Sequence, residues 1–163
     1  MSSIEYMLVK LTAQSSGPNP KDPGGGVPQF TAADISLIAS AAPHMAYHAM
    51  MAKFCDDAIS EKALLEWARK TAIEEWCSNP AYAALRIEAR QLNRMAELVV
   101  LTFVNPQIPH AKTTVSMAAY VGAAETTYRR NFSPLYSFLA GEIGYLEQIG
   151  TRAILKFRYG DEA

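Results

Sequence analysis

Two adjacent arginines, Arg129 and Arg130, are the side chains of this sequence best suited to contacts with a nucleic acid. Arginine can bind the edge of a guanine through two hydrogen bonds, or it can hold a phosphate group. Thr126 and Glu125, just before them, can add discrimination between bases, and Glu125 is also favourable for local reasons at the positive N-terminus of a helix. Together with Ala124, these residues form the predicted DNA-binding set.

The segment that has to position this set, residues 113–132, has the pattern of a helix, a glycine turn and a second, short helix. Ala118 stands four positions before Gly122, so two helices can pack closely while the glycine takes the positive φ angle of the corner. In such a helix-turn-helix unit, the DNA-binding set projects toward a major groove. The residues expected to face inward are Met117, Ala118, Val121, Ala123 and Tyr128. A tight helical hairpin with only a structural role needs the same positions, so that alternative stays open.

Three further arginines, Arg86, Arg90 and Arg94, recur every four residues and are expected to form one row on a helix. Such a row could bind phosphate groups or a protein partner. An ordinary solvated helix face, balanced by Glu88 and Glu97, explains the same spacing and is the favoured interpretation.

Metal binding and catalysis have weaker support in the sequence. His44 and His48 stand one helical turn apart, as two metal ligands can, and Cys55 could lie on the same side. A third ligand is missing nearby, so two partly buried histidines satisfied by backbone or water are the favoured interpretation. The phosphate-binding glycine loops and nucleophile motifs of enzymes do not occur either. The sequence therefore predicts no metal, no cofactor and no enzyme activity.

Composition and charge narrow the class of protein. The chain has 163 residues, half of them apolar, and a net charge of −1, which fits one domain with a real core and gives the whole molecule no electrostatic attraction to nucleic acid or membrane. Basic charge is local, because residues 105–158 hold six Lys or Arg against three Asp or Glu. Cys55 and Cys77 form no Cys-x-x-Cys pair, as fits a reducing cytosol. Since no apolar run approaches a membrane span, we expect a cytoplasmic protein.

Helical spacing of apolar residues, without convincing period-two alternation, predicts an all-α fold of about six or seven helices with a long final helix. Residues 1–29 are expected to be a flexible arm, since residues 14–29 hold four prolines and four glycines, although residues 1–13 have the spacing of a short helix. A single helical DNA-binding domain then spans residues 30–163. Outside the helix-turn-helix segment, its helices are expected from Thr31 to before Pro43, from His44 to about Cys55, from Glu61 (capped by Ser60) to about Trp76, from Pro80 to about Val104, and from Ser133 to about Arg158.

The last helix carries more apolar residues than one face holds. Its main stripe is Leu135, Leu139, Ile143, Leu146, Ile149, Ala153 and Phe157. Phe138, Tyr145 and Ile154 add apolar side chains on other faces, beyond what one small domain needs to bury. A homodimer would cover this excess and would present two reading helices to half-sites roughly 34 Å apart.

Two segments carry a resemblance to a known family: MAAYVGAAETTYRRNFSPLYSFLAGEIGYLEQIGTRAI, which begins at Met117, and FTAADISLIASAAPHMAYHAMMAKFCDD, which begins at Phe30. They resemble small bacteriophage regulators of the antitermination protein Q-like kind. The shared features are a small-residue-x-x-x-Gly corner, an aromatic-Arg-Arg segment, a Pro-x-Tyr helix start and an acidic, Leu-rich last helix. The resemblance covers residues 30–158 loosely.

The chain departs from these regulators in two places. Relatives of this kind often carry a Cys-x-x-Cys zinc ribbon before the helix-turn-helix, whereas this chain has only the connector NPQIPHAK. Asn131 stands where helix-turn-helix units usually bury an aliphatic residue, and Phe132 is expected to take over that packing role one position later.

The resemblance implies a phage or prophage transcription regulator that binds double-stranded DNA near a late promoter and acts on bacterial RNA polymerase. The residues alone predict less: a helical domain with one DNA-reading helix. The competing hypothesis is a helical interaction protein, such as an inhibitor or assembly factor, whose last helix pairs with a partner and never touches DNA.

Overall fold

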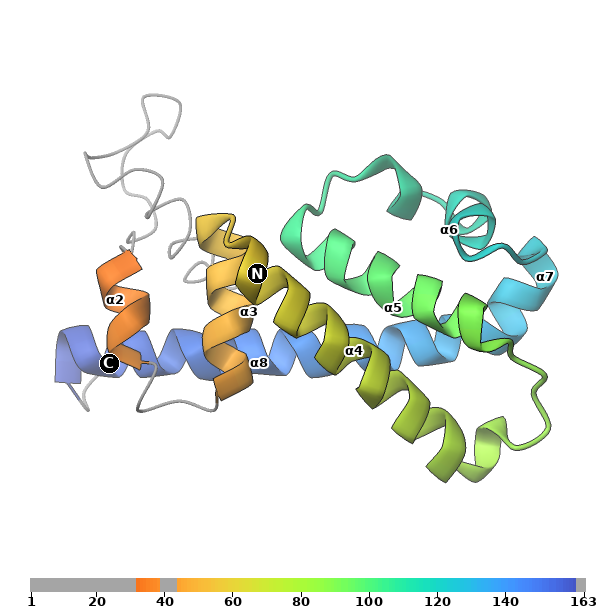
Figure 1. Cartoon of the computed structure of the whole chain (residues 1–163), viewed down its shortest axis with the longest axis horizontal. Coiled ribbons are helices and arrows are strands. Elements are labelled where there is room, and N and C mark those ends of the chain that lie inside the picture. Colours follow the sequence, from red (N-terminus) through yellow and green to blue (C-terminus); the bar gives the residue numbers. More distant parts are fainter. Residues whose placement is uncertain (1–31, 39–43, 161–163) are drawn as a thin grey trace. The chain divides into compact units, whose positions relative to one another are not determined.

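The computed structural model describes residues 32–38 and 44–160, and Figure 1 shows their helices. This part of the chain is helical and contains no strand, which confirms the predicted all-α class and the long last helix. The α-helices are α2 (Ala32–Leu37), α3 (His44–Cys55), α4 (Ala58–Ser78), α5 (Ala89–Val104), α6 (Thr114–Val121), α7 (Glu125–Thr127) and α8 (Ser133–Tyr159). Shorter elements are the 3-10 turns η2 (Pro80–Tyr82) and η3 (Pro109–Ala111) and the π-helical turn η4 (Tyr128–Phe132). The arm and short helix predicted within residues 1–29, and the predicted helix start at Thr31, lie outside the described residues.

The described helices belong to two compact units. Unit 1 takes the described residues up to Leu64 and those from Ile143 onward, and unit 2 runs from Leu65 to Glu142. The two longest helices, α4 and α8, therefore each contribute one part to unit 1 and another to unit 2. Within the described ranges, no helix combines the length and the apolar character needed to cross a membrane.

Unit 1 is built around an apolar cluster that joins α2, α3 and α8. Its buried members are Ile35 and Ile38, Met50 and Phe54, and Ile154. Full burial of a side chain of this size contributes roughly 1.5–3 kcal/mol relative to exposure. These five residues are therefore a large part of what holds the three helices together.

The same unit contains a buried ion pair. Lys53 on α3 and Glu147 on α8 lie 2.5 Å apart, measured from Nζ to Oε1, and each side chain keeps less than a tenth of its surface exposed. Two buried charges of opposite sign compensate each other, whereas removing one would leave the other in a medium that disfavours it. The pair therefore specifies where α3 lies along α8.

The start of α4 differs from the prediction. The Asp57 carboxylate accepts a hydrogen bond of 3.1 Å from the Ser60 backbone N–H, as an N-cap side chain does. The helix accordingly begins at Ala58 and not at Glu61. Ser60, the predicted cap, is buried, and its hydroxyl lies 2.8 Å from Nδ1 of His48.

The buried face of α8 shifts along the helix. Leu135, Leu139 and Ile143 are buried as predicted, but Phe157 is exposed. In the second half, the buried positions are Leu146, Glu147, Gly150, Thr151 and Ile154. The predicted stripe is therefore only partly right there: Leu146 is buried and Ile149 and Ala153 are half-buried, but the sequence pattern excluded the polar positions, one of which an ion pair allows to hold a carboxylate. Ile154, which the sequence analysis counted as excess, belongs to the core of unit 1.

The single helix predicted over residues 80–104 is broken in the structure. After η2, residues 85–88 are not helical, and α5 begins only at Ala89. Tyr82 and Ile87 are both buried. On one continuous helix, two positions five residues apart would face directions about 140° apart. The break allows both side chains to reach the interior.

Gly150 tests the packing of α8 on α3. An added Cβ at this position would lie 2.5 Å from Cγ of Met50, which is fully buried. Gly150→Ala should therefore lower the free energy of unfolding by about 1–3 kcal/mol through overpacking. Gly144→Ala is the matched control, because nothing lies within 4 Å of its added Cβ, and it should stabilise α8 by about 0.5–1 kcal/mol. Urea unfolding of both variants measures the difference, and effects of the same sign would contradict this packing.

Candidate nucleic-acid interface

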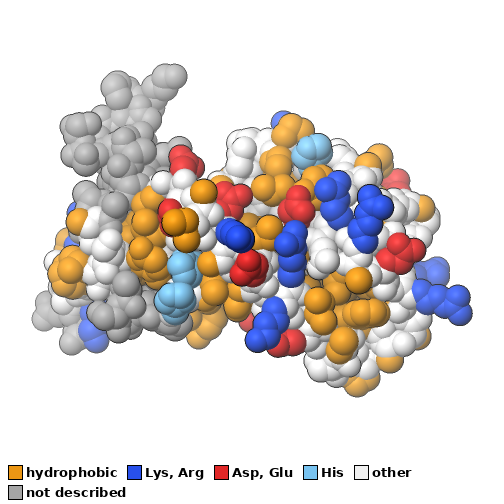
Figure 2. Space-filling model, viewed as in Figure 1, with side chains coloured by type: hydrophobic (Ala, Val, Ile, Leu, Met, Phe, Trp, Pro, Cys, Tyr) orange, Lys and Arg blue, Asp and Glu red, His pale blue; other side chains and the backbone are white. Residues whose placement is uncertain are grey.

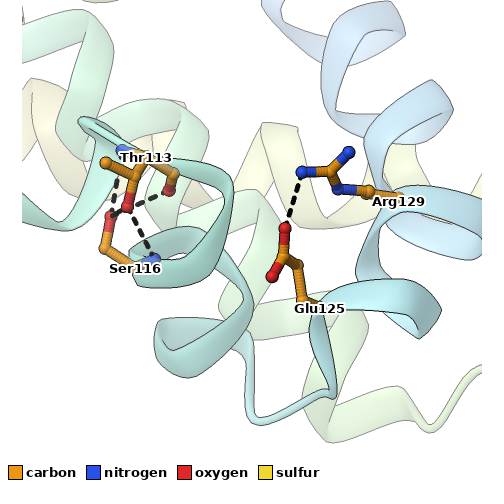
Figure 3. Close-up of polar contacts among 4 residues, drawn as sticks. All are labelled: Thr113, Ser116, Glu125 and Arg129. Atoms are coloured by element: carbon orange, nitrogen blue, oxygen red, sulfur yellow. Dashed lines mark hydrogen bonds and ion pairs between the residues drawn. The ribbon is translucent and has the colours of Figure 1, made fainter.

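Both ends of helix α6 are specified by its own sequence. At the start, Thr113 and Ser116 form a capping box, in which each side-chain oxygen accepts from the other residue's backbone N–H (Figure 3). At the end, Gly122 has φ 82° and ψ 37°, the left-handed conformation predicted for the corner. The N–H groups of Gly122 and Ala123 both donate to the Ala118 carbonyl, a pattern that satisfies the last carbonyls of a helix. The predicted glycine turn is therefore confirmed.

Side chains of α5 bind the last carbonyls of α6. Gln91 Nε2 donates to the Gly122 oxygen at 2.9 Å, and Arg94 Nε donates to the Tyr120 oxygen at 3.1 Å. Arg94 also lies over the Tyr120 ring, with its guanidinium carbon 4.4 Å from the ring centroid, and the Tyr120 hydroxyl donates to Glu97. Because the C-terminus of a helix is partly negative, an arginine is favourable there. These contacts hold the carboxyl end of α6 against α5 at the position where the chain turns.

The second helix of the corner does not end where the sequence analysis placed its end. From Glu125 the chain passes through α7, η4 and α8 with helical dihedrals at Thr127, Tyr128 and Ser133. The Ser133 N–H donates to the carbonyl of Tyr128, five residues back, so the helix is widened at this turn. Pro134 explains the widening, since it has no N–H and its ring would clash with the carbonyl four residues earlier in a regular α-helix. The last helix, α8, begins at Ser133 as predicted, but it follows η4 without a break in helical dihedrals.

The corner separates an inner from an outer set of side chains. Of the predicted inner residues, Ala118, Val121 and Tyr128 are buried, and Met117 and Ala123 are half-buried. Of the predicted DNA-binding set, Ala124, Thr126, Arg129 and Arg130 are exposed, and Glu125 is half-buried. Glu125 and Arg129 form an ion pair at 2.6 Å (Figure 3). A pair of this exposed i, i+4 kind contributes only about 0.2–0.5 kcal/mol, so Arg129 can exchange this carboxylate for another acceptor at little cost.

The position expected to hold an aliphatic residue is buried but polar. Asn131 keeps only 9% of its surface exposed, and its Oδ1 is buried without a hydrogen-bond partner in the described part of the chain. Phe132 is fully buried and stacks on Tyr128, with the ring centroids 6.1 Å apart. The expected packing by Phe132 is confirmed, and in the widened turn Asn131 is buried beside it.

Arg86 does not share a helix with Arg90 and Arg94, so the predicted row of three does not exist. Arg86 instead lies close to the corner, where it and Arg130 line one pocket of about 310 Å³. The other polar residues of this pocket are Thr126, Thr127 and Asn131. The sequence does not predict this grouping, because Arg86 and Arg130 stand far apart in the chain and no spacing rule connects them.

Arg90 and Arg94 line a second pocket of about 250 Å³ next to the last turn of α6. Glu88 and Gln91 line it too. Arg94 is already engaged with α6, and Glu88 offsets the charge of Arg90 nearby. Figure 2 shows the same mixture on the drawn face, where several Lys and Arg side chains are interspersed with acidic ones. This second pocket is therefore a weaker anion site than the first.

The two histidines lie in unit 1, away from these groups in the sequence. Their rings meet edge to face, with centroids 4.4 Å apart, and His48 is bonded to Ser60. Burial, and then the neighbouring His44, lower the pKa of His48 below its ordinary value. Within the described residues, no group of three or more His, Cys, Asp or Glu side chains is arranged to hold a metal ion. The expectation of two partly buried histidines satisfied by backbone or water is therefore not met, because His44 is exposed and half-buried His48 is bonded to the Ser60 side chain.

Comparison with known proteins does not identify a family. No protein-family model matches the chain, and no curated protein or solved structure matches it.

Gly122 tests whether the corner is real. Because its φ is positive and nothing lies within 4 Å of an added Cβ, a substitution there is strained by the backbone and not by crowding. Gly122→Val should lower the free energy of unfolding by more than about 1–2 kcal/mol, the cost of the left-handed conformation for an ordinary residue. Gly122→Asn should cost less, since asparagine tolerates this conformation. Thermal unfolding compares the two, and equal losses would argue against a left-handed corner in solution.

Tyr120 tests how α6 is fastened to α5. Burial, followed by the hydrogen bond to Glu97, raises the pKa of Tyr120 to about 12. An unfolded tyrosine titrates at about pH 10. The raised pKa of Tyr120 therefore stabilises the folded state fully below that pH, and this contribution is lost as the pH rises toward 12. In Tyr120→Phe, the free energy of unfolding should fall less steeply between pH 10 and 12 than in the wild type. Urea unfolding over that range checks this, and an unchanged slope would contradict the burial of this hydroxyl.

Proposed function

We propose that this protein is a DNA-binding regulator of transcription that reads a major groove with the α6–α7 corner. The observation that supports the proposal is the sorting of side chains at that corner. Ala118, Val121 and Tyr128 are buried, whereas four of the five members of the predicted DNA-binding set are exposed and Glu125 is half-buried. A helix-turn-helix unit needs this division, because its second helix packs through one face and enters the groove with the other.

Arg130 is the principal contact in this proposal. It is exposed, and it makes no salt bridge within the described residues, so no intramolecular acceptor has to be given up on binding. Arg129 has to leave Glu125, and Glu125 would then be available to accept from a cytosine amino group. In the proposed complex, Thr126 at the start of the helix is close to a phosphate or a base edge of the DNA.

The narrower part of the proposal comes from the family resemblance. It is that of a phage or prophage regulator that acts as an antiterminator with bacterial RNA polymerase, in the cytoplasm of the host cell. The resemblance to antitermination protein Q-like regulators over the corner and α8 supports this assignment. Because the connector before the corner carries no Cys-x-x-Cys zinc ribbon, the proposal assigns the reading of bases to the corner.

A second copy of the chain is part of the proposal. Tyr145, Phe157 and Tyr159 on α8 each expose more than half of their surface. Exposed aromatic side chains of this kind are enriched at protein interfaces. The same residues fit the competing hypothesis, a helical interaction protein whose α8 binds a different partner, so the decisive test is DNA binding.

The test is a salt series of binding to random duplex DNA. The wild type should bind with a linear loss of log K against log salt concentration. Arg130→Ala should weaken binding by about 1–3 kcal/mol, and a loss limited to some sequences would mark a base contact. Arg152→Ala, which removes an exposed arginine of α8 in unit 1, is the charge-matched control and should leave affinity nearly unchanged.

Two results would favour the helical interaction protein. One is a wild type that binds no duplex DNA at any salt concentration. The other is a double variant, Arg129→Ala with Arg130→Ala, that keeps both its fold and its DNA affinity.

A further inference from the structure

The first pocket of unit 2 is built from hydrogen-bond donors. Its polar lining residues are Arg86 and Arg130, Thr126 and Thr127, and Asn131, all of which carry side-chain donors. Among the described residues that line it, none is an Asp or a Glu. A concave site with two positive charges, two hydroxyls and no carboxylate selects an anion.

Asn131 is the least expected member of this lining. It is nine-tenths buried, and its Oδ1 has no partner in the described part of the chain. A buried amide that is only partly satisfied costs free energy in the unbound protein. Oδ1 is an acceptor, so only a donor such as water can complete its hydrogen bonding, whereas the amide NH₂ of Asn131 is the group that can donate to an anion.

We propose that this pocket holds a phosphate group of the DNA backbone, with Arg86 as a phosphate-binding residue outside the helix-turn-helix unit. This inference rests on the proposed function. Thr126 and Arg130 belong both to the pocket and to the predicted DNA-binding set, so the pocket borders the surface that faces DNA. A helix in a major groove has a phosphate backbone on either side, and contacts to these phosphates set its register.

The break before α5 is what allows Arg86 to take part in the pocket. The chain leaves the helical path over residues 85–88, and Arg86 there lines the same pocket as Arg130. Two guanidinium groups can grip one phosphate from two directions, each with a pair of parallel hydrogen bonds. Lysine at position 86 would keep the charge but would lose the paired geometry.

The experiment uses the full-length chain and a duplex selected from a random library by the wild type. Arg86→Ala should lower affinity about tenfold or more at low salt, as expected for a hydrogen bond to a charged group, by the same factor on every sequence. The slope of log K against log salt should become shallower by about 0.9, the value for one phosphate contact. Thr127→Val, which removes one hydroxyl at nearly constant size, should weaken binding in the same uniform way, and Arg152→Ala is the control. Thermal unfolding confirms that each variant is folded.

A set of duplexes, each with one phosphate replaced by a neutral methylphosphonate, locates the contact. For the wild type, one such replacement should cost as much as Arg86→Ala, and for Arg86→Ala the same replacement should cost nothing further.

If Arg86→Ala keeps the wild-type affinity and salt slope, or if the two losses add at every phosphate, the pocket does not hold a backbone phosphate, although DNA binding by the corner would stand. If the wild type binds no DNA, the proposed function fails and this inference fails with it. Binding of inorganic phosphate alone, in a manner that depends on Arg86, would then assign the pocket to a free anion.

Discussion

The left-handed backbone at Gly122 is the constraint on which the candidate site depends. It ends α6, redirects the chain within two residues, and places α7 so that one face is covered and the other is open. The corner is not held by the glycine alone. Gln91 and Arg94 of α5 bind the carbonyls that the turn exposes, so that the polar cost of ending a helix is offset by two side chains from a neighbouring one.

The helix that follows the corner shows how a local conflict is resolved without ending an element. Pro134 has no N–H to donate to the preceding turn, and its ring would clash with that turn in a regular α-helix. The helix is widened there, at η4. The widened turn buries Phe132 against Tyr128 and leaves Asn131 next to the pocket. The proline therefore accounts for the widened turn, and the widened turn lets the helix continue past it.

The arginines of unit 2 have separate roles that a row on one helix face would not allow. Arg94 caps α6 and stacks on Tyr120. Arg129 is paired with Glu125, while Arg86 and Arg130 meet at the pocket. An arginine that stabilises the fold is a poor candidate for binding DNA, since it would have to give up its partner. Arg86 and Arg130 line the same pocket, and neither makes a salt bridge within the described residues.

Local signals in the sequence were sufficient for several elements. The asparagine and proline that end a helix at residue 105, the helical spacing of α3 and the glycine of the corner predicted an all-α chain and a left-handed turn at Gly122, because each depends on residues within one or two turns of each other. The exposed set at the corner followed from the same short-range periodicity. Such signals do not depend on what the rest of the chain packs against.

Only the tertiary structure decided the rest. The break before α5, the buried face of α8 around Glu147, and the meeting of Arg86 with Arg130 each depend on groups distant in the chain. A carboxylate is buried when a lysine from another helix compensates it, and two arginines become one site when a loop brings them together. Periodicity in one segment carries no information about either event, since it records which face of an element is apolar and not what that face will meet.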